Sequence, residues 1–245
     1  PIFEGTRDIV RTSETNLGNL ITDSILSKSG ADLALTNGGG IRASIEIGDI
    51  TRKNVFDVLP FGNLIAVKDV PGSAIKDMLE FSVRLYPESN GGFLHASGVT
   101  FAFDESKEPL NRVHDIKIQG ETLDPNKTYK LATNDFMAAG GDGYTMLGEY
   151  PITAEMVSLE EALADYIAEI GGTVSIEKEN RIRIEAMQEE QEQQQEKNVY
   201  IVKPGDNLSR IAYKYGMTWQ DLQKVNNLKD PNLIFPDQEI IIPAA

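Results

Sequence analysis

The stretch DLALTNGGGIR, residues 32–42, decides how the larger part of this 245-residue chain is interpreted. Its apolar first half predicts a short buried strand over residues 32–36, and three glycines follow almost directly. Residues 38–43 (GGGIRA) satisfy the G-x-G-x-x-A pattern of dinucleotide-binding proteins. That fold also requires a long helix immediately after the glycines, whereas Gly48 interrupts the sequence here. We therefore interpret the run either as a loop whose backbone N–H groups a ligand can approach or as a tight structural turn.

The segments around this stretch alternate between helical and strand patterns without a regular repeat. Apolar residues recur at helical spacing from Leu17 to Ile25 and again after Pro71-Gly72, and Ser158-Leu-Glu-Glu161 is typical of a capping box that begins a helix. Strands are predicted at 64–70, 99–103, 113–118, 129–133 and 181–184, with 113–118 and 129–133 joined around Gln119-Gly120. This mixed order predicts an α+β fold with a mixed sheet.

The composition excludes several classes of function. The formal net charge of 23 − 38 = −15 repels a polyanion, so a nucleic-acid partner is not expected. No apolar run approaches the ~18 residues of a membrane span. The absence of cysteine excludes disulfides, thiolate-ligated metals and thiol nucleophiles. The two histidines, His95 and His114, cannot build a histidine-rich metal site, and we expect both to be partly exposed on strands or loops.

A change of composition at residues 185–197 predicts two domains. This segment carries five Glu and five Gln and has no apolar stripe, which favours an interdomain linker over a coiled coil. It separates a domain over residues 1–184 from a small one over residues 198–245. The small domain reads as a strand, two helices that begin near Leu208 and Thr218, and a final strand, in the order βααβ.

Two further clusters join the glycine stretch as candidates for chemistry: LPFGN at 59–63 and NDFMAAGGDGY at 134–144. Phe61 and Phe136 stand beside turn residues and are expected to be displayed rather than buried. Two such rings would stack on a nucleobase, at ~1–3 kcal/mol per base. Arg42 would bind phosphate with its planar guanidinium, and Asp142 would accept hydrogen bonds from ribose hydroxyls.

Four motifs in register, ETNLGNL (14–20), NGGGIR (37–42), LPFG (59–62) and residues 134–144, resemble the C-terminal domain of the 5′-nucleotidase/UDP-sugar hydrolase family over residues 1–184. The resemblance implies a domain that binds the base, ribose and part of the phosphate of a nucleotide. In that family a separate N-terminal metallophosphoesterase domain holds two divalent metal ions and performs the hydrolysis. No Asp-x-His, Gly-Asn-His or Gly-His-x-His segment of that domain occurs in this chain. We therefore interpret the chain as a C-terminal portion that has no catalytic residue, metal or cofactor of its own and is inactive alone.

The resemblance also implies roles for individual residues. Phe61 and Phe136 would be the stacking pair, and Arg11 and Arg42 would contact phosphate or nearby oxygens. Some relatives carry a further arginine one helical turn after Arg11, where this chain has Thr15, which makes the phosphate end less cationic. The other implied positions are Asn37 for the base, Asp142 for the ribose hydroxyls, and Asn63 and Gly92 as further lining residues.

Residues 198–245 resemble a LysM module, on the pattern YIVKPGDNL (200–208), NNL (226–228) and IIP (241–243). LysM modules bind glycans that contain N-acetylglucosamine, peptidoglycan in bacteria and chitin elsewhere. Asn207 and Asp237 depart from the usual Thr or Ser and the usual Gly, and both residue types suit a helix start or a turn. Trp219 is expected in the core, and the alternative is that it stacks on a sugar. The implied groove lies between two loops whose backbone groups would meet acetamido groups: Gly205, Asp206, Asn207 and Leu208 in one, and Pro231, Asn232, Leu233 and Ile234 in the other.

The leading interpretation is the nucleotide-recognition portion of an extracellular, cell-wall-associated bacterial 5′-nucleotidase, which hydrolyses AMP-like nucleotides to nucleosides and phosphate. The alternative is a non-catalytic protein that binds a nucleotide or another ligand and is anchored to the cell wall. A metallophosphoesterase domain encoded upstream of Pro1 would favour the enzyme. A third interpretation, a structural spacer, predicts that Arg11, Phe61, Phe136 and Asp142 lie far apart in the fold.

Overall fold

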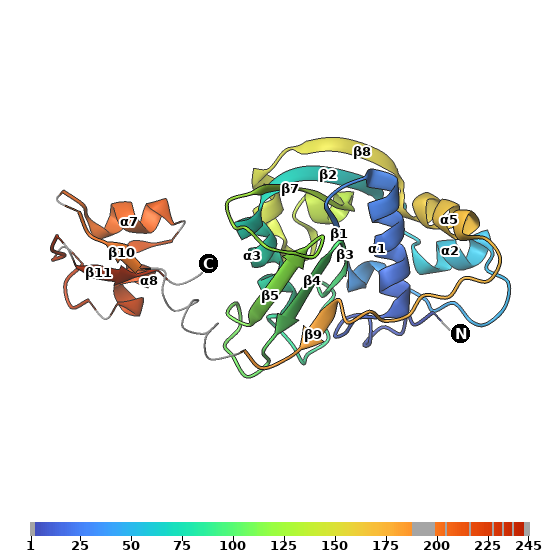
Figure 1. Cartoon of the computed structure of the whole chain (residues 1–245), viewed down its shortest axis with the longest axis horizontal. Helices are drawn as coiled ribbons and strands as arrows, with labels where there is room; N and C mark the ends of the chain where they lie inside the picture. Colours follow the sequence, from blue (N-terminus) through green and yellow to red (C-terminus); the bar gives the residue numbers. More distant parts are fainter. Residues whose placement is uncertain are drawn as a thin grey trace. The chain divides into compact units, whose positions relative to one another are not determined.

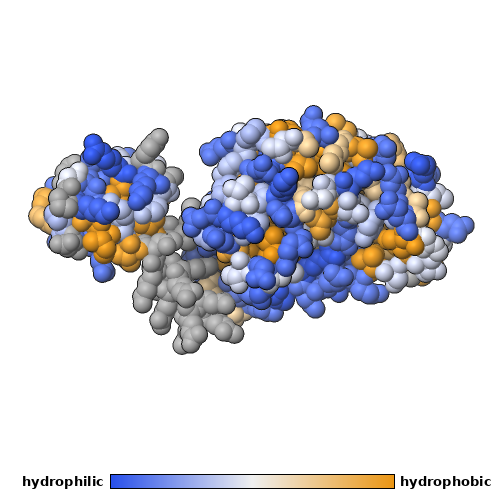
Figure 2. Space-filling model, turned by 45° about the horizontal axis from the view of Figure 1, so that its top comes forward, coloured by the Kyte–Doolittle hydropathy of each residue, from blue (hydrophilic) through white to orange (hydrophobic). Residues whose placement is uncertain are grey.

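The computed structural model describes residues 3–187, 199–203, 205–215, 217–226, 228–231, 233–236 and 238–242. The chain divides into two compact units, Pro1–Ala186 and Met187–Ala245 (Figure 1). Of the predicted linker at 185–197, only residues 185–187 belong to the described residues. None of the described helices is both long and apolar enough for a membrane span. Hydrophilic residues cover most of the face of the first unit that Figure 2 shows, with hydrophobic residues in separate patches.

The first unit combines helices with strands in a mixed order. Its helices are α1 (Asn16–Ser29), α2 (Arg52–Val58), α3 (Gly72–Val83), α4 (Asp135–Ala138) and α5 (Leu159–Ile170), with short 3-10 helices η1 (Gly38–Gly40), η2 (Gly141–Gly143) and η3 (Thr145–Glu149). Its strands are β1 (Leu33–Asn37), β2 (Leu64–Pro71), β3 (Leu94–Ser97), β4 (Val99–Phe103), β5 (Val113–Ile118), β6 (Glu121–Thr122), β7 (Thr128–Asn134), β8 (Ile152–Ser158) and β9 (Ile182–Ile184). The predicted α+β class with mixed sheets is confirmed.

A five-stranded sheet forms the centre of this unit, in the order β3-β1-β7-β2-β8. Strands β1 and β7 are parallel, and the other pairs are antiparallel. Side chains alternate between the two faces of a strand. Leu33 and Leu35 therefore pack in one core with residues of α3, β4 and β5, whereas Ala34 packs in another core with residues of α1, α2 and α5. Figure 1 accordingly shows α1 and α3 on opposite sides of β1 and β7.

Helix α1 has a local signal at each end. The Thr15 side chain accepts a hydrogen bond from the Gly18 backbone N–H, which makes Thr15 the N-cap, and Gly30 ends the helix with a φ of 61°. Thr15, which the resemblance relates to the phosphate end of the site, is fully buried in this capping role. Helix α5 begins in the same way, because Ser158 accepts a hydrogen bond from the Glu161 N–H.

The prediction that the strands at 113–118 and 129–133 are joined around Gln119-Gly120 is wrong, because β6 lies between them in the chain. Both turn residues have positive φ, 51° and 82°, which suits a tight hairpin turn. The turn returns the chain only into β6, where Ile118 pairs with Glu121. Strand β7 instead lies between β1 and β2 in the central sheet, and β5 belongs to a second sheet in the order β6-β5-β4-β9.

Both histidines are buried, contrary to the expectation that they are partly exposed. His95 on β3 is 0% exposed and His114 on β5 is 7% exposed. Each places its Nε2 2.9 Å from a backbone carbonyl oxygen, of Val10 and Glu185 respectively. These hydrogen bonds compensate for the loss of water around one nitrogen of each ring.

The second unit has the predicted βααβ order. Its described elements are β10 (Val199–Ile201), α7 (Leu208–Lys214), α8 (Trp219–Val225) and β11 (Glu239–Ile241), with the two strands antiparallel. Its core contains Leu208, Leu222 and Ile240. Trp219 is 38% exposed and lies outside this core, so its predicted burial is wrong. Leu222 is the residue of α8 that is buried there.

Candidate functional site

One edge of the central sheet collects the ends of three strands. Strands β1 and β7 are parallel, so their last residues, Asn37 and Asn134, lie at the same edge. Strand β2 is antiparallel to β7, with Ile65 opposite Asn134, so the chain enters β2 at this edge directly after Asn63. The topology therefore brings together three asparagines that are far apart in the sequence.

A cavity of about 420 Å³ opens at this edge. Its volume lies in the range of about 300–1,000 Å³ that is typical of small-molecule sites. Seven of the eight predicted nucleotide-site residues line it, and the four that the spacer interpretation required to lie apart are among them. The lining residues are Arg11, Asn37, Gly39, Gly40, Arg42, Phe61, Asn63, Gly91, Phe136 and Asp142.

Gly92 is the predicted residue that does not line the cavity. It is buried behind the wall, where its N–H donates to Asn90 Oδ1 at 3.0 Å and its carbonyl accepts the Tyr144 hydroxyl. Gly91 takes the predicted place, and its carbonyl accepts the Gly39 N–H at 2.7 Å. The sequence shows two adjacent glycines, Gly91 and Gly92, and does not indicate which of them lines the cavity. Their contacts in the structure show that it is Gly91.

The two phenylalanines of the cavity are displayed, as predicted. Phe61 is 60% exposed and Phe136 is 46% exposed. The guanidinium of Arg42 lies 5.7 Å from the centre of the Phe61 ring, within the range of a cation–π contact. The Phe136 ring packs directly on the Gly141 backbone, where a Cβ atom would come within 2.5 Å of a ring carbon. Glycine at 141 is therefore a condition for the position of this ring.

A chain of amide hydrogen bonds positions the carboxylate of Asp142. Asn134 Nδ2 donates to Asn37 Oδ1 at 3.0 Å, and Asn37 Nδ2 donates to Asp142 Oδ2 at 2.6 Å. Asp142 has a φ of 52°, a left-handed conformation that Asp adopts more readily than most residues. An amide group has two N–H donors, so Asn37 can offer its second N–H to a ligand. The third asparagine at this edge, Asn63, donates to Asp135 Oδ1 at 2.7 Å.

The cationic end of the cavity is built around Arg11. Burial lowers the pKa of Arg11, and repulsion from Arg7 and Arg42 lowers it further, whereas Asp142 acts in the opposite direction. Arg11 Nε is buried and has no hydrogen-bond partner among the described residues. A phosphate or other oxygen acceptor from a ligand would satisfy this donor and reduce the repulsion between the arginines.

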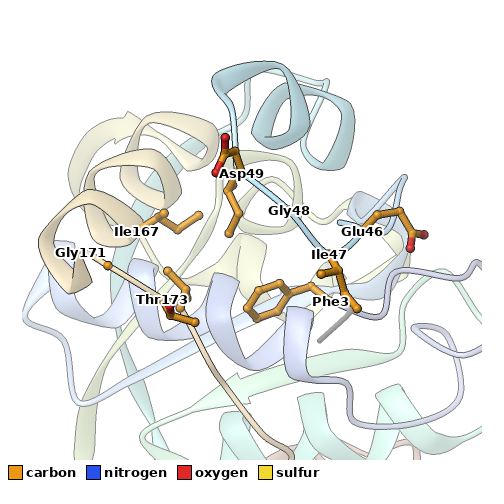
Figure 3. Close-up of a pocket in the computed structure, with 11 residues that line it drawn as sticks. Phe3, Glu46, Ile47, Gly48, Asp49, Ile167, Gly171 and Thr173 are labelled. Carbon is orange, nitrogen blue, oxygen red and sulfur yellow. The ribbon is translucent and has the colours of Figure 1, made fainter.

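A second cavity, of about 510 Å³, is lined by none of the predicted residues (Figure 3). Its apolar lining residues are Phe3, Ile47, Ile50, Ile167 and Val174. In Figure 3 the Phe3 ring points toward the segment that carries Thr173, whereas the Glu46 carboxylate points away from it. None of the described residues that line it is cationic, so this cavity does not suit a phosphate.

The described residues do not fit the pair of divalent ions that the resemblance implies for a separate domain. Among them, no group of three or more His, Cys, Asp or Glu side chains is arranged to hold a metal ion. The lining of the described cavity offers aromatic rings, hydrogen-bonding groups and charged side chains.

The first predicted glycan loop is ordered by its own polar side chains. Asp206 Oδ2 accepts hydrogen bonds from the Lys203 N–H at 2.8 Å and the Tyr200 hydroxyl at 2.7 Å, and Gly205 has a φ of 89°. Asn207 Oδ1 accepts the Arg210 N–H at 2.9 Å and so caps α7. Leu208 is buried, so only its backbone could face a ligand.

In the second predicted loop, the side chain of Leu233 is 54% exposed, and Pro231 and Ile234 are partly buried. Asn232 and Asp237 lie outside the described residues.

Comparison with known proteins gives two domain matches along the chain. Residues 2–149 match the family model of the 5′-nucleotidase C-terminal domain, and residues 200–243 match that of the LysM domain. The trifunctional nucleotide phosphoesterase protein YfkN of Bacillus subtilis is 38% identical over 191 residues, which is 74% of this chain and 13% of that protein. Protein UshA of Escherichia coli is 44% identical over 149 residues, which is 61% of this chain and 26% of that protein.

A solved structure agrees with this match. The crystal structure of a 5′-nucleotidase precursor from Thermus thermophilus superimposes with a TM-score of 0.70 at 41% identity, over 75% of this chain and 38% of that one. The chain spans about a quarter or less of the length of the two curated relatives named above. Since the first family model covers more than half of the chain, the chain belongs to the family of 5′-nucleotidase C-terminal domains, and a LysM domain follows in the same chain.

Proposed function

We propose that the 420 Å³ cavity binds a nucleoside or an AMP-like nucleotide, as the substrate-recognition part of a 5′-nucleotidase. The observation that carries the proposal is the gathering of Arg11, Arg42, Phe61, Phe136 and Asp142 around one cavity. Exposed aromatic rings beside two guanidiniums and one carboxylate form a set that matches the base, phosphate and sugar of one ligand. Relatives whose names describe nucleotidase activity support the same assignment.

Each part of the ligand has a counterpart in the cavity. Phe61 and Phe136 hold the base by stacking. The Asp142 carboxylate, oriented by Asn37, accepts hydrogen bonds from the ribose hydroxyls. Arg11 and Arg42 face the phosphate, whose charge offsets the mutual repulsion that lowers the pKa of Arg11. Binding thus places the nucleotide with its base held between side chains and its phosphate at the cationic end.

The activity of the longer protein follows from this proposal. A metal-dependent domain outside this chain would hydrolyse the bound nucleotide to nucleoside and phosphate, and this chain alone would be inactive. The LysM domain would bind peptidoglycan or another N-acetylglucosamine glycan and hold the enzyme at the cell wall, outside the cell. The alternative, a wall-anchored protein that binds nucleotides without hydrolysis, predicts that the gene encodes no metallophosphoesterase domain.

The first test is calorimetric titration of the whole chain with adenosine and with AMP. We expect saturable binding, and an affinity about 5- to 150-fold lower in Phe136→Ala, because a stacked base contributes ~1–3 kcal/mol. The matched control is Phe56→Ala, since Phe56 is 57% exposed on α2 and lies outside the cavity. Absence of saturable binding in the folded wild type, or equal affinities of Phe136→Ala and the wild type, would overturn the proposal.

A further inference from the structure

Lys68 is a buried cation in the central sheet. It lies within β2, is 3% exposed, and has no acidic side chain paired with it among the described residues. Its Nζ donates to three backbone carbonyls, of Ala138 at 2.8 Å, Leu147 at 2.7 Å and Tyr150 at 2.7 Å. An ammonium group has three N–H donors, so every donor of Lys68 is used by a backbone acceptor.

The three carbonyls belong to one segment of the candidate site, residues 138–150, and two of them lie at its ends. Residues 138–150 begin at the end of α4, the four-residue helix that carries Phe136, and they include Asp142. Between the carbonyls lie only two short 3-10 helices, and Gly140, Asp142 and Gly143 have positive φ. The segment's own backbone hydrogen bonds are short-range turn bonds, such as Tyr144 N–H to the Gly141 carbonyl and Leu147 N–H to the Tyr144 carbonyl. Contacts from elsewhere therefore help to select its conformation.

We propose that Lys68 is a positioning residue of the nucleoside site: its three hydrogen bonds hold residues 138–150 in the conformation that places Phe136 and Asp142 at the cavity. This inference rests on the proposed nucleoside-binding function.

The energetics of burial support a role beyond filling space. A buried ammonium without a carboxylate partner loses its hydration, and burial lowers the pKa of Lys68 accordingly. A methionine of similar length would fill the same space without that cost. It would leave the carbonyls of Ala138 and Tyr150 without the donor that Lys68 supplies, and the Leu147 carbonyl would keep only the Tyr150 N–H at 3.2 Å. Ala138 and Leu147 are buried residues. Since unsatisfied buried carbonyls are unfavourable, the segment would move to reach water or new donors. The rearrangement would fall on the residues that carry the site.

The test compares Lys68→Met with Val70→Ala in the whole chain. Both residues are buried on β2, but the apolar side chain of Val70 donates no hydrogen bond to residues 138–150. We expect Lys68→Met to bind adenosine about tenfold or more weakly, comparable to the loss of one stacking ring. Hydrogen exchange should become faster in residues 138–150 and remain unchanged in β4 and β5. Val70→Ala should lower the melting temperature and keep the wild-type affinity below its transition.

Chemical rescue separates positioning from a general defect. The chain has no cysteine, so Lys68→Cys introduces a single thiol. Alkylation of the denatured variant with 2-bromoethylamine restores a lysine-like ammonium, with sulfur in place of one methylene, and alkylation with iodoacetamide adds a neutral group. After refolding, the aminoethylated protein should recover the affinity of wild type treated in the same way, whereas the carbamidomethylated protein should not.

Two results would overturn the role of Lys68 while the wild type still binds adenosine. One is wild-type affinity in Lys68→Met, and the other is equal affinity of the two alkylated proteins, both folded by circular dichroism. Failure of the wild type itself to bind adenosine would instead overturn the proposed function.

Discussion

His95 ties the packing of the first unit to the segment that carries Arg11. It is fully buried on β3, and its Nε2 hydrogen bonds to the carbonyl oxygen of Val10 at 2.9 Å. The carbonyl of Arg11 accepts the Asn90 N–H at 3.2 Å, so two backbone contacts hold this turn beside the cavity. Gly18 packs against the other ring nitrogen, Nδ1, which has no hydrogen-bond partner among the described residues. The ring is thus enclosed, and the Val10 carbonyl and the Glu14 carboxylate, which favour its charged form, offset the effect of burial only in part.

This environment predicts an acid-sensitive fold. Burial lowers the pKa of His95 from 6.5 to about 4, so the folded chain keeps the imidazole neutral where the unfolded chain binds a proton. The contribution of His95 to stability is complete above about pH 6.5 and is lost as the pH falls toward 4. The free energy of unfolding is measured by urea titration at pH 7.5 and at pH 4.5. Its decrease between the two pH values should be about 2–3 kcal/mol smaller in His95→Gln than in the wild type.

Asp77 titrates in the same pH range as His95, so the pH dependence of the wild type alone would not isolate the effect of His95. Burial raises the pKa of Asp77 from 3.8 to about 6, so its protonation stabilises the fold as the pH falls from about 6 toward 4. This effect opposes that of His95 but is common to both proteins and cancels in the difference. An equal pH dependence of His95→Gln and the wild type would contradict the role assigned to His95.

At the scale of elements, the short helix η2 supports Phe136 through Gly141. A Cβ atom at residue 141 would lie within 2.5 Å of the Phe136 ring, so Gly141→Ala must displace the ring. We expect the adenosine affinity to fall about tenfold or more, as for partial loss of a stacking contact. Gly148→Ala in η3 is the matched control, because no atom lies within 4 Å of the position its Cβ would take. Calorimetry that finds the same affinity in both variants would show that Phe136 does not contribute through this position.

Elements with local signals were predictable, and those fixed by distant partners were not. Thr15 and Gly30 mark α1 within the segment itself, and α1 was predicted correctly. Strands β5 and β7 belong to different sheets, and the partners of each come from distant parts of the chain. The predicted direct connection of these two strands was therefore wrong. Strand β3, which contains the buried His95, is only four residues long and was not predicted.

The candidate site divides along the same line. The chemistry of local residue types singled out Phe61, Phe136, Arg42 and Asp142. The family resemblance added Arg11, Asn37 and Asn63, which also line the cavity. The residues that hold them in place are defined by contacts over long separations in sequence. Lys68 contacts carbonyls 70 to 82 residues away, and Asn134 contacts Asn37 across 97 residues. No local pattern indicates either contact.

At the scale of the whole molecule, the chain combines two units with separate hydrophobic cores and different expected ligands. The cavity of the first unit lies within residues 11–142, and the LysM match covers residues 200–243. Since no residue is common to the two predicted sites, each should bind its ligand without the other. A wall-bound chain that still captures nucleosides is therefore the arrangement that the two domains together predict.

This independence is testable by retention on insoluble peptidoglycan. The bound wild type should take up radiolabelled adenosine with the dissociation constant it has in solution. Leu233→Asp, in a predicted glycan loop, should lose about tenfold or more in retention, because a carboxylate replaces an exposed apolar contact, yet should bind adenosine normally. Phe136→Ala should show the reverse.

Val225→Asp is the control, since Val225 is 40% exposed on α8 outside both loops and should leave retention unchanged. Equal retention of Leu233→Asp and Val225→Asp would remove the second loop from the glycan site, and a shift in adenosine affinity on the peptidoglycan would show that the two sites are coupled.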